Sequence, residues 1–200
     1  MRAIVIEKFG PTVDSLIYKE IPEPEPQEGT VVIQVKAFGI NHAEMHMRRG
    51  EWAEAAPVSG IECVGIVKAC PGGEFPVGAK VAALMGGLGR TINGSYAEYT
   101  RAPVSNVLLI EADLPWAELA TLPESYATAW TCLFRNLEIT AGQTVVIRGA
   151  TSSLGQAAVK LAVNAGARVI ATTRKEARFG MLKELGVERV ELEGPDLSKR

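Results

Sequence analysis

The chain contains two histidines, His42 and His46, which lie four residues apart in the stretch Gly39–Trp52. If this stretch is helical, both imidazoles lie on one helical turn and could supply two nitrogen ligands to zinc. Glu44 lies two residues from each histidine, so at helical spacing its carboxylate points elsewhere. Because a catalytic zinc takes about three protein ligands, we predict no metal site and expect the segment to have another role.

A second candidate is the stretch "VVIRGATSSLGQAAVK", residues 145–160, which has the pattern of a tight turn between a buried strand and a helix. The N-terminus of such a helix offers free backbone N–H groups and a positive dipole end to a pyrophosphate. The usual G-x-G-x-x-G glycines are replaced by Ala150 and Ser152 at the first two positions, and only Gly155 remains. Gly155 would let the helix pack closely on the strand.

Ser152 and Ser153 can cap this helix and offer hydroxyl groups to a phosphate. We therefore predict a dinucleotide-binding loop, and the alternative is an ordinary turn whose serines only cap the helix. The residues predicted to contact the phosphates are Ala150, Thr151, Ser152, Ser153, Leu154 and Gly155.

The end of the following strand selects between the two nicotinamide dinucleotides. An acidic residue at this place would bind the ribose 2′-hydroxyl of NADH, but the chain has Thr173, Arg174 and Lys175 there. Arg174 could pair with a 2′-phosphate, and Arg178, one helical turn further, could assist. The sequence therefore favours NADPH as the cofactor. The alternative is that these cations are the solvated start of a helix.

The elements that position these motifs change in type near residue 115. Strand-like segments with Gly and Pro turns precede that point and predict a barrel-like domain; they cover residues 2–9, 30–40, 63–70, 79–86 and 95–103. The glycine run at 85–94 leads into a strand and predicts a mobile loop, with no helix dipole to face a phosphate. Helical spacing then covers 114–137, with an interruption at Pro123.

The rest of the chain predicts a β-α-β-α-β order, the first half of a doubly wound parallel sheet. The strands are expected at 143–149, 168–173 and 189–193, and the helices at 152–166 and 175–186. The first of these helices is expected to bury one apolar face made of Leu154, Ala158, Leu161, Ala162 and Ala165. A full dinucleotide fold has about six parallel strands, so we expect a fragment of a longer protein. A natural half-domain completed by a partner is the alternative.

Composition narrows the class of protein. The chain has 200 residues, 47% of them hydrophobic and 22% charged, with a net charge of -2. These values are typical of a globular protein, and without a basic cluster we expect no nucleic-acid partner. Every long apolar stretch is interrupted by a polar residue, so we expect no membrane span. Cys63, Cys70 and Cys132 form no CxxC motif, which favours reduced thiols and a cytoplasmic location.

Taken together, these residues resemble the medium-chain dehydrogenase/reductase superfamily, in its zinc-independent quinone-oxidoreductase-like branch, over all 200 residues. The resemblance is carried by the segments 37–52, 93–103, 122–130 and 142–162, and by a G-x-E-x-x-G-x-V signature at Gly60, Glu62, Gly65 and Val67. It implies an α/β plus β fold, with a GroES-like β-barrel domain at 1–115 and the start of a Rossmann domain at 116–200. Ser152-Ser153 departs from the pair of glycines that relatives usually carry.

The resemblance also implies roles for individual residues. Zinc-dependent relatives hold the metal through a Cys at the position of Asn41 and a His at that of Ile61, and this chain has neither ligand. Asn41 matches an asparagine near the nicotinamide ribose, and Thr128 matches a position near the nicotinamide. The branch often has Tyr at the positions of His46 and Trp52.

From these positions we expect a set of catalytic residues, Asn41, His46, Arg48 and Trp52. His46 could donate a hydrogen bond or proton, Arg48 could stabilise a developing oxyanion, and Trp52 could stack on a flat ring. The alternatives are structural: a surface or packing role for His42, a solvated Arg49, a core role for Trp52 and an interior helical position for Thr128.

The expected function is reduction of a quinone or an α,β-unsaturated carbonyl by hydride from NADPH, because without zinc a substrate activated by conjugation fits best. The partner would then be a small-molecule quinone or enone, with a homodimer in the full-length protein. One alternative is a non-catalytic NADPH-binding protein, favoured by the loss of both tyrosine positions. Another is an enoyl-thioester reductase, disfavoured because its expected Tyr is Trp52.

Overall fold

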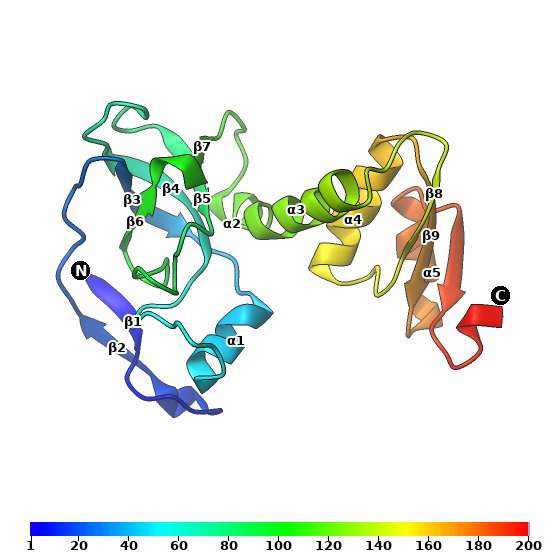
Figure 1. Cartoon of the computed structure of the whole chain (residues 1–200), viewed down its shortest axis with the longest axis horizontal. Coiled ribbons are helices and arrows are strands. Elements are labelled where there is room, and N and C mark those ends of the chain that lie inside the picture. Colours follow the sequence, from blue (N-terminus) through cyan, green and yellow to red (C-terminus); the bar gives the residue numbers. More distant parts are fainter. Residues whose placement is uncertain (200) are drawn as a thin grey trace. The chain divides into compact units, whose positions relative to one another are not determined.

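The computed structural model describes residues 1–199, which form two compact units (Figure 1). Unit 1 is Met1–Glu124, and unit 2 begins at Ser125. The division falls later in the chain than the domain boundary predicted after residue 115, which stays a prediction. The first short helix after that boundary packs in unit 1, with Leu119 and Ala120 against Val64 and Ala82.

Unit 1 is built from antiparallel strands. Its strands are β1 (Arg2–Ile6), β2 (Leu16–Glu20), β3 (Thr30–Ala37), β4 (Glu62–Ala69), β5 (Lys80–Leu84), β6 (Tyr99–Pro103) and β7 (Val107–Leu109). β1 and β2 form a hairpin, and the other five form one sheet in the order β6-β3-β4-β5-β7. Bridges at Ala3–Ala97 and Val5–Val58 join the hairpin to the rest of the unit. The sequence analysis did not predict β2 and β7.

Three short helices and two helical turns complete unit 1. They are η1 (Val13–Ser15), α1 (His42–Arg49), η2 (Val104–Asn106), α2 (Trp116–Leu119) and the first residues of α3 (Pro123–Trp130). The predicted interruption at Pro123 is the start of α3, a position where proline is tolerated because its missing N–H would have no helical partner. α1 ends at Gly50, whose φ of 73° places it in the left-handed region.

Unit 2 holds a three-stranded sheet with all strands parallel, in the order β10-β9-β8. Its elements are η3 (Thr131–Asn136), β8 (Thr144–Ile147), α4 (Ser153–Asn164), β9 (Arg168–Thr173), η4 (Glu176–Arg178), α5 (Phe179–Glu184), β10 (Arg189–Leu192) and η5 (Leu197–Lys199). The predicted β-α-β-α-β order is confirmed. The fold class is confirmed too: a β-rich first unit precedes the start of a parallel α/β sheet.

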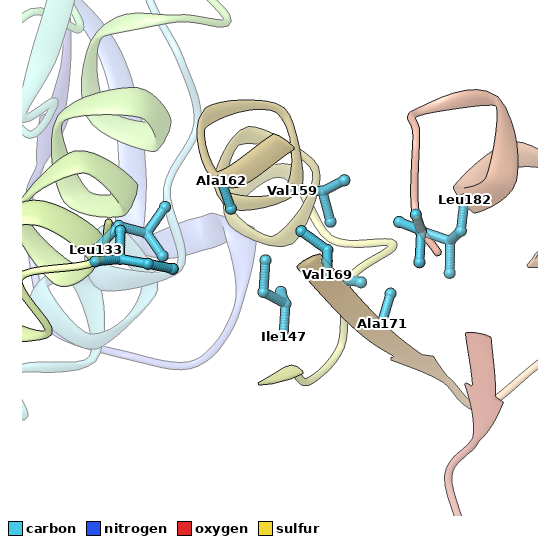
Figure 2. Close-up of a cluster of buried hydrophobic side chains, with 10 residues drawn as sticks. Leu133, Ile147, Val159, Ala162, Val169, Ala171 and Leu182 are labelled. Atoms are coloured by element: carbon cyan, nitrogen blue, oxygen red, sulfur yellow. The ribbon is translucent and has the colours of Figure 1, made fainter. Parts of the chain in front are cut away.

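The predicted apolar face of α4 is correct in part: Ala162 is buried, and Ala158 and Leu161 pack half-buried against the core. The buried residues of the helix are Gly155, Ala157, Val159 and Ala162, while Leu154 is exposed. Figure 2 shows Val159 and Ala162 beside the strand residues Ile147 and Val169, with which they form the core of unit 2. The first turn of the helix packs closely because Gly155 lies against the backbone of the turn that follows β8. Leu154, at the start of the helix, lies outside this contact and is exposed.

Among residues 1–199, none of the helices combines the length and the apolar character that crossing a bilayer requires.

Candidate functional site

A cavity of about 670 Å³ lies in unit 2 at the carboxyl ends of the parallel strands. It is lined by Arg148, Gly149, Thr151, Ser152, Thr173, Arg174 and Glu193. Each of these residues follows β8, precedes α4, or lies at or directly after the end of β9 or β10. In open α/β sheets this edge is where ligands bind, and the volume lies in the range of small-molecule sites.

The N-terminus of α4 is capped at this cavity. Ser152 is the N-cap, and its Oγ accepts a hydrogen bond of 3.0 Å from the backbone N–H of Gly155. A Cβ added to Gly155 would lie 2.5 Å from the carbonyl oxygen of Gly149 and 2.6 Å from the Cα of Ala150. The helix therefore approaches the turn as closely as glycine allows, and its first N–H groups have no intrahelical partner. This geometry fits the phosphates of a dinucleotide.

Some of the predicted cofactor-binding residues line this cavity, and others do not. Thr151, Ser152, Thr173 and Arg174 line it, and Arg174 is exposed. Within residues 1–199, Arg174 makes no hydrogen bond or ion pair, so its guanidinium is available to an anion. The remaining residues lie outside the lining: Ala150 is buried, Leu154 and Arg178 are exposed, Ser153 begins α4, and Thr128 is half-buried on α3. Their contacts with a cofactor stay predictions.

Arg148 and Glu193 line the same cavity, and the sequence analysis did not single them out. Arg148 donates from Nε at 3.2 Å and from Nη2 at 2.7 Å to the two carboxylate oxygens of Glu193. Thr172 Oγ1 donates to Glu193 at 2.5 Å. These hydrogen bonds, that of Arg148 first, lower the pKa of Glu193 to about 2. The signal that could have found both residues is their place, each directly after a parallel strand.

Unit 1 contains a smaller cavity of about 240 Å³ around Trp52. Its lining is mostly apolar and consists of Ala43, Met47, Trp52, Ile61, Met85, Gly86, Gly87, Leu88, Arg90 and Glu124. The guanidinium carbon of Arg90 lies 5.5 Å from the centroid of the Trp52 ring. Arg90 also pairs with Glu54 at 3.0 Å. The cavity therefore combines a flat apolar surface with one cation, Arg90, and one acidic residue, Glu124.

The glycine run predicted as a loop forms one wall of this cavity. Met85 has a φ of 57°, a left-handed conformation that is uncommon outside glycine. Gly86 and Gly87 follow with φ of 61° and 94°. Strained backbone of this kind occurs at ligand-binding segments, and it places the Met85 side chain, 43% exposed, at the cavity.

The four predicted catalytic residues are not brought to one cavity. Trp52 lines the cavity described above, whereas Asn41 and Arg48 line another of about 210 Å³. Arg48 Nη2 donates to the carbonyl of Pro11 at 2.8 Å, which places its guanidinium at the surface loop after β1. Arg90, which was not predicted, is the cation beside Trp52. The catalytic roles of the four residues stay predictions.

The histidine pair of the opening stretch lies on α1, with ring centroids 5.2 Å apart. His46 Nδ1 contacts the carboxylate of Glu51, and this hydrogen bond holds the pKa of Glu51 below its usual value. Across residues 1–199, no group of three or more His, Cys, Asp or Glu side chains is placed to hold a metal ion. The donor set at α1 is thus two imidazoles, one of which already has a carboxylate partner.

A buried polar network supports Asn41, and sequence reasoning missed it. Glu44 Oε2 accepts from the backbone N–H of Asn41 at 2.7 Å and from the Tyr96 hydroxyl at 2.5 Å, and Glu44 Oε1 accepts from the Ile61 N–H at 3.0 Å. Burial, followed by the Glu44 contact, raises the pKa of Tyr96. Burial raises the pKa of Glu62 as well. Glu44 was predicted to point away from the histidines, and it points into the unit to hold the start of α1.

Comparison with known proteins places these features in context. The family described as "Alcohol dehydrogenase GroES-like domain" matches residues 27–112. A quinone oxidoreductase of Lama guanicoe is 27% identical over 197 residues, which cover 95% of this chain and 58% of that protein. A mycobacterial protein solved in complex with NADPH is 28% identical, with a TM-score of 0.84 over 98% of this chain and 59% of that one. The structure of an NAD-dependent alcohol dehydrogenase is 29% identical, with a TM-score of 0.90 over 100% of this chain and 66% of that one.

These relatives are longer than the chain. It spans from 7% to 58% of the length of the curated relatives compared, and from 58% to 66% of the solved structures.

Proposed function

Because the chain belongs to the medium-chain dehydrogenase/reductase superfamily and is quinone-oxidoreductase-like, we propose that it is an NADPH-dependent oxidoreductase. In this proposal, hydride passes to a quinone or an α,β-unsaturated carbonyl, without a catalytic zinc. A cytoplasmic location, and a homodimer in a longer protein, belong to the same proposal.

The observation that carries the cofactor assignment is the exposed Arg174 at the cavity of unit 2. The capped start of α4, with Ser152 at the N-cap and Gly155 against the turn, supports binding of the pyrophosphate. Arg174 supports binding of a 2′-phosphate, since guanidinium pairs strongly with phosphate. One similar structure is NAD-dependent and another holds NADPH, so the preference for NADPH rests on Arg174.

The substrate assignment is supported by the cavity of unit 1. A bound NADPH would supply the hydride. Trp52 offers a flat face on which a quinone ring or a conjugated chain can stack. Arg90, 5.5 Å from that ring, can stabilise the negative charge that develops on a substrate oxygen. Solvent or His46 would then supply the proton. The proposal requires no Lewis acid, because conjugation already activates the acceptor.

The direct test is a fluorescence titration of the chain with NADPH and with NADH, followed by turnover assays with a simple quinone and with a crotonyl thioester. Saturable binding that is tighter for NADPH, with oxidation of NADPH by the quinone, is the expected result. Binding without turnover of either acceptor would favour the non-catalytic NADPH-binding protein. Turnover of the thioester alone would favour the enoyl-thioester reductase, and the absence of binding by a folded chain would contradict the proposal.

A further inference from the structure

We propose that Arg148 is a specificity-determining residue, which keeps the cofactor cavity selective for NADPH by masking the carboxylate of Glu193. With Arg148 in place, the free charge that the cavity offers to the ribose is the cation of Arg174. Without Arg148, the cavity would present a carboxylate that repels a 2′-phosphate and accepts a hydrogen bond from a ribose 2′-hydroxyl. The inference rests on the proposed binding of NADPH.

Arg148 and Glu193 have the geometry of a strong ion pair. Arg148 donates from two nitrogens, Nε at 3.2 Å and Nη2 at 2.7 Å, to the two oxygens of Glu193. This arrangement engages both carboxylate oxygens at once, the fork-to-fork contact in which guanidinium and carboxylate bind best. The Glu193 side chain is 16% exposed and that of Arg148 72% exposed, so the arginine covers the acid on its solvent side.

The acid is also fixed in place by the sheet. Thr172 Oγ1 donates to Glu193 Oε1 at 2.5 Å, and the same hydroxyl accepts from the Gly149 N–H at 3.2 Å. The Glu193 N–H donates to the carbonyl of Thr173 at 2.8 Å. Glu193 therefore stays at the cavity when its arginine is removed, because neighbouring strand ends hold it.

The charge of the cavity lining explains why masking Glu193 affects the choice between NADPH and NADH. Dinucleotide-binding sheets select NADH with an acidic residue near the ribose, and this chain has its acid one strand further along, beside the same cavity as Arg174. An ordinary Glu carboxyl is ionised at neutral pH even without a partner. Two arginines and one glutamate give the lining a charge of +1, and removing Arg148 lowers it to 0 and uncovers the acid.

The net charge of the lining also ranks the variants by their expected preference for NADPH. Glu193→Gln raises the lining charge to +2, so its preference for NADPH should equal or exceed that of the wild type. Arg148→Met should lose the preference. The double variant Arg148→Met/Glu193→Gln has no acid left to uncover and keeps Arg174, so its preference should return toward that of the wild type.

The experiment is a fluorescence titration of these four proteins with NADPH and with NADH at low ionic strength, with circular dichroism to verify folding. The ratio of the two dissociation constants should shift toward NADH on the order of tenfold in Arg148→Met and recover in the double variant. Arg189→Met, which removes the exposed ion pair with Glu191 at the start of β10, is the matched control and should leave the ratio unchanged. Arg148→Lys keeps a cation and should retain most of the preference, which provides a second variant if Arg148→Met does not fold.

Two results would overturn the inference. An unchanged ratio in Arg148→Met would show that Arg148 does not set the preference. An equal loss in the single and double variants would show that Arg148 contacts the phosphate itself. If the wild type binds neither nucleotide, the proposed function fails and the inference fails with it, whereas a selective wild type with an unchanged Arg148→Met overturns the inference alone.

Discussion

Glu62 joins Asn41 to the start of helix α3. Its Oε1 accepts a hydrogen bond of 2.8 Å from Asn41 Nδ2, and its Oε2 accepts one of 2.8 Å from the backbone N–H of Glu124. The carboxylate is buried, and a Cβ on Gly39 would lie 2.1 Å from its Oε1. The side chain that the family resemblance connects with the nicotinamide ribose is therefore held by an acid on β4.

Replacing Glu62 by Ala should destabilise unit 1 by about 2–4 kcal/mol, because it leaves a cavity and two donors without an acceptor. Urea-induced unfolding followed by tryptophan fluorescence measures this loss, since Trp52 and Trp116 lie in unit 1. Glu28→Ala, at an exposed position, is the matched control and should change the unfolding free energy little. A Glu62→Ala protein as stable as the control would contradict the structural role.

The stabilising contribution of Glu62 should depend on pH. Burial raises its pKa above the ordinary value of 4.5, and the Asn41 hydrogen bond only partly opposes this. An acid with a raised folded-state pKa contributes stability that is fully present below its ordinary pKa and is lost as the pH rises through the raised value. The difference in unfolding free energy between wild type and Glu62→Ala should therefore be larger at pH 4 than at pH 8. A difference that shrinks on acidification would show that the hydrogen bonds outweigh burial.

Gly155→Ala should destabilise unit 2 and weaken nucleotide binding, because its Cβ would meet backbone atoms of Gly149 and Ala150 at 2.5 and 2.6 Å. Backbone cannot move aside cheaply, so we expect a loss of about 2 kcal/mol or more. Gly180→Ala in α5 is the control: nothing lies within 4 Å of its added Cβ, and alanine there should stabilise the helix by about 0.5–1 kcal/mol. Thermal unfolding of both variants should show a lower midpoint for Gly155→Ala and a higher one for Gly180→Ala than for the wild type.

Arg90→Met should raise the KM for a quinone about threefold to tenfold with a smaller effect on NADPH binding, since Arg90 lies over Trp52 in the substrate cavity. Arg101→Met is the control, because Arg101 instead donates to the carbonyl of Glu25 at 3.0 Å. Steady-state kinetics with both substrates varied separates the two effects. Equal KM values in the two variants would show that Arg90 does not contribute to substrate binding.

Two of the three thiols, Cys63 and Cys132, should differ in reactivity. Cys63 is fully buried in the core of unit 1, and burial raises its pKa to about 12. Cys132 is exposed on η3. A thiol reagent at pH 8 should therefore label Cys132 rapidly and Cys63 only after the protein unfolds. Mass spectrometry of the labelled peptides gives the order, and fast labelling of Cys63 in the folded protein would contradict its burial.

The sequence alone determined the fold class and the β-α-β-α-β order of unit 2, whereas β2 and β7 of unit 1 were not predicted. Val and Ile runs divided by Gly and Pro turns predict strands, and the spacing after residue 115 predicts the β-α-β-α-β order; both depend on local backbone preferences that neighbouring residues carry. The sequence also located the turn between β8 and α4, which ends at the N-cap Ser152, and the cation Arg174, because a strand, a turn and a helix in succession fix their place.

Tertiary structure decided which residues meet. Arg90, not Arg48, lies beside Trp52, because the backbone turns after β5 bring residue 90 back to the cavity while the Arg48 side chain is bound to Pro11. Glu193 reaches Arg148 because parallel strands end at one edge of the sheet, although the two residues are far apart along the chain. Glu44 and Glu62 are buried because each has donors that come from other elements. The periodic pattern of one segment does not show which distant residue each side chain will contact. These contacts are therefore decided only when the chain packs into its tertiary structure.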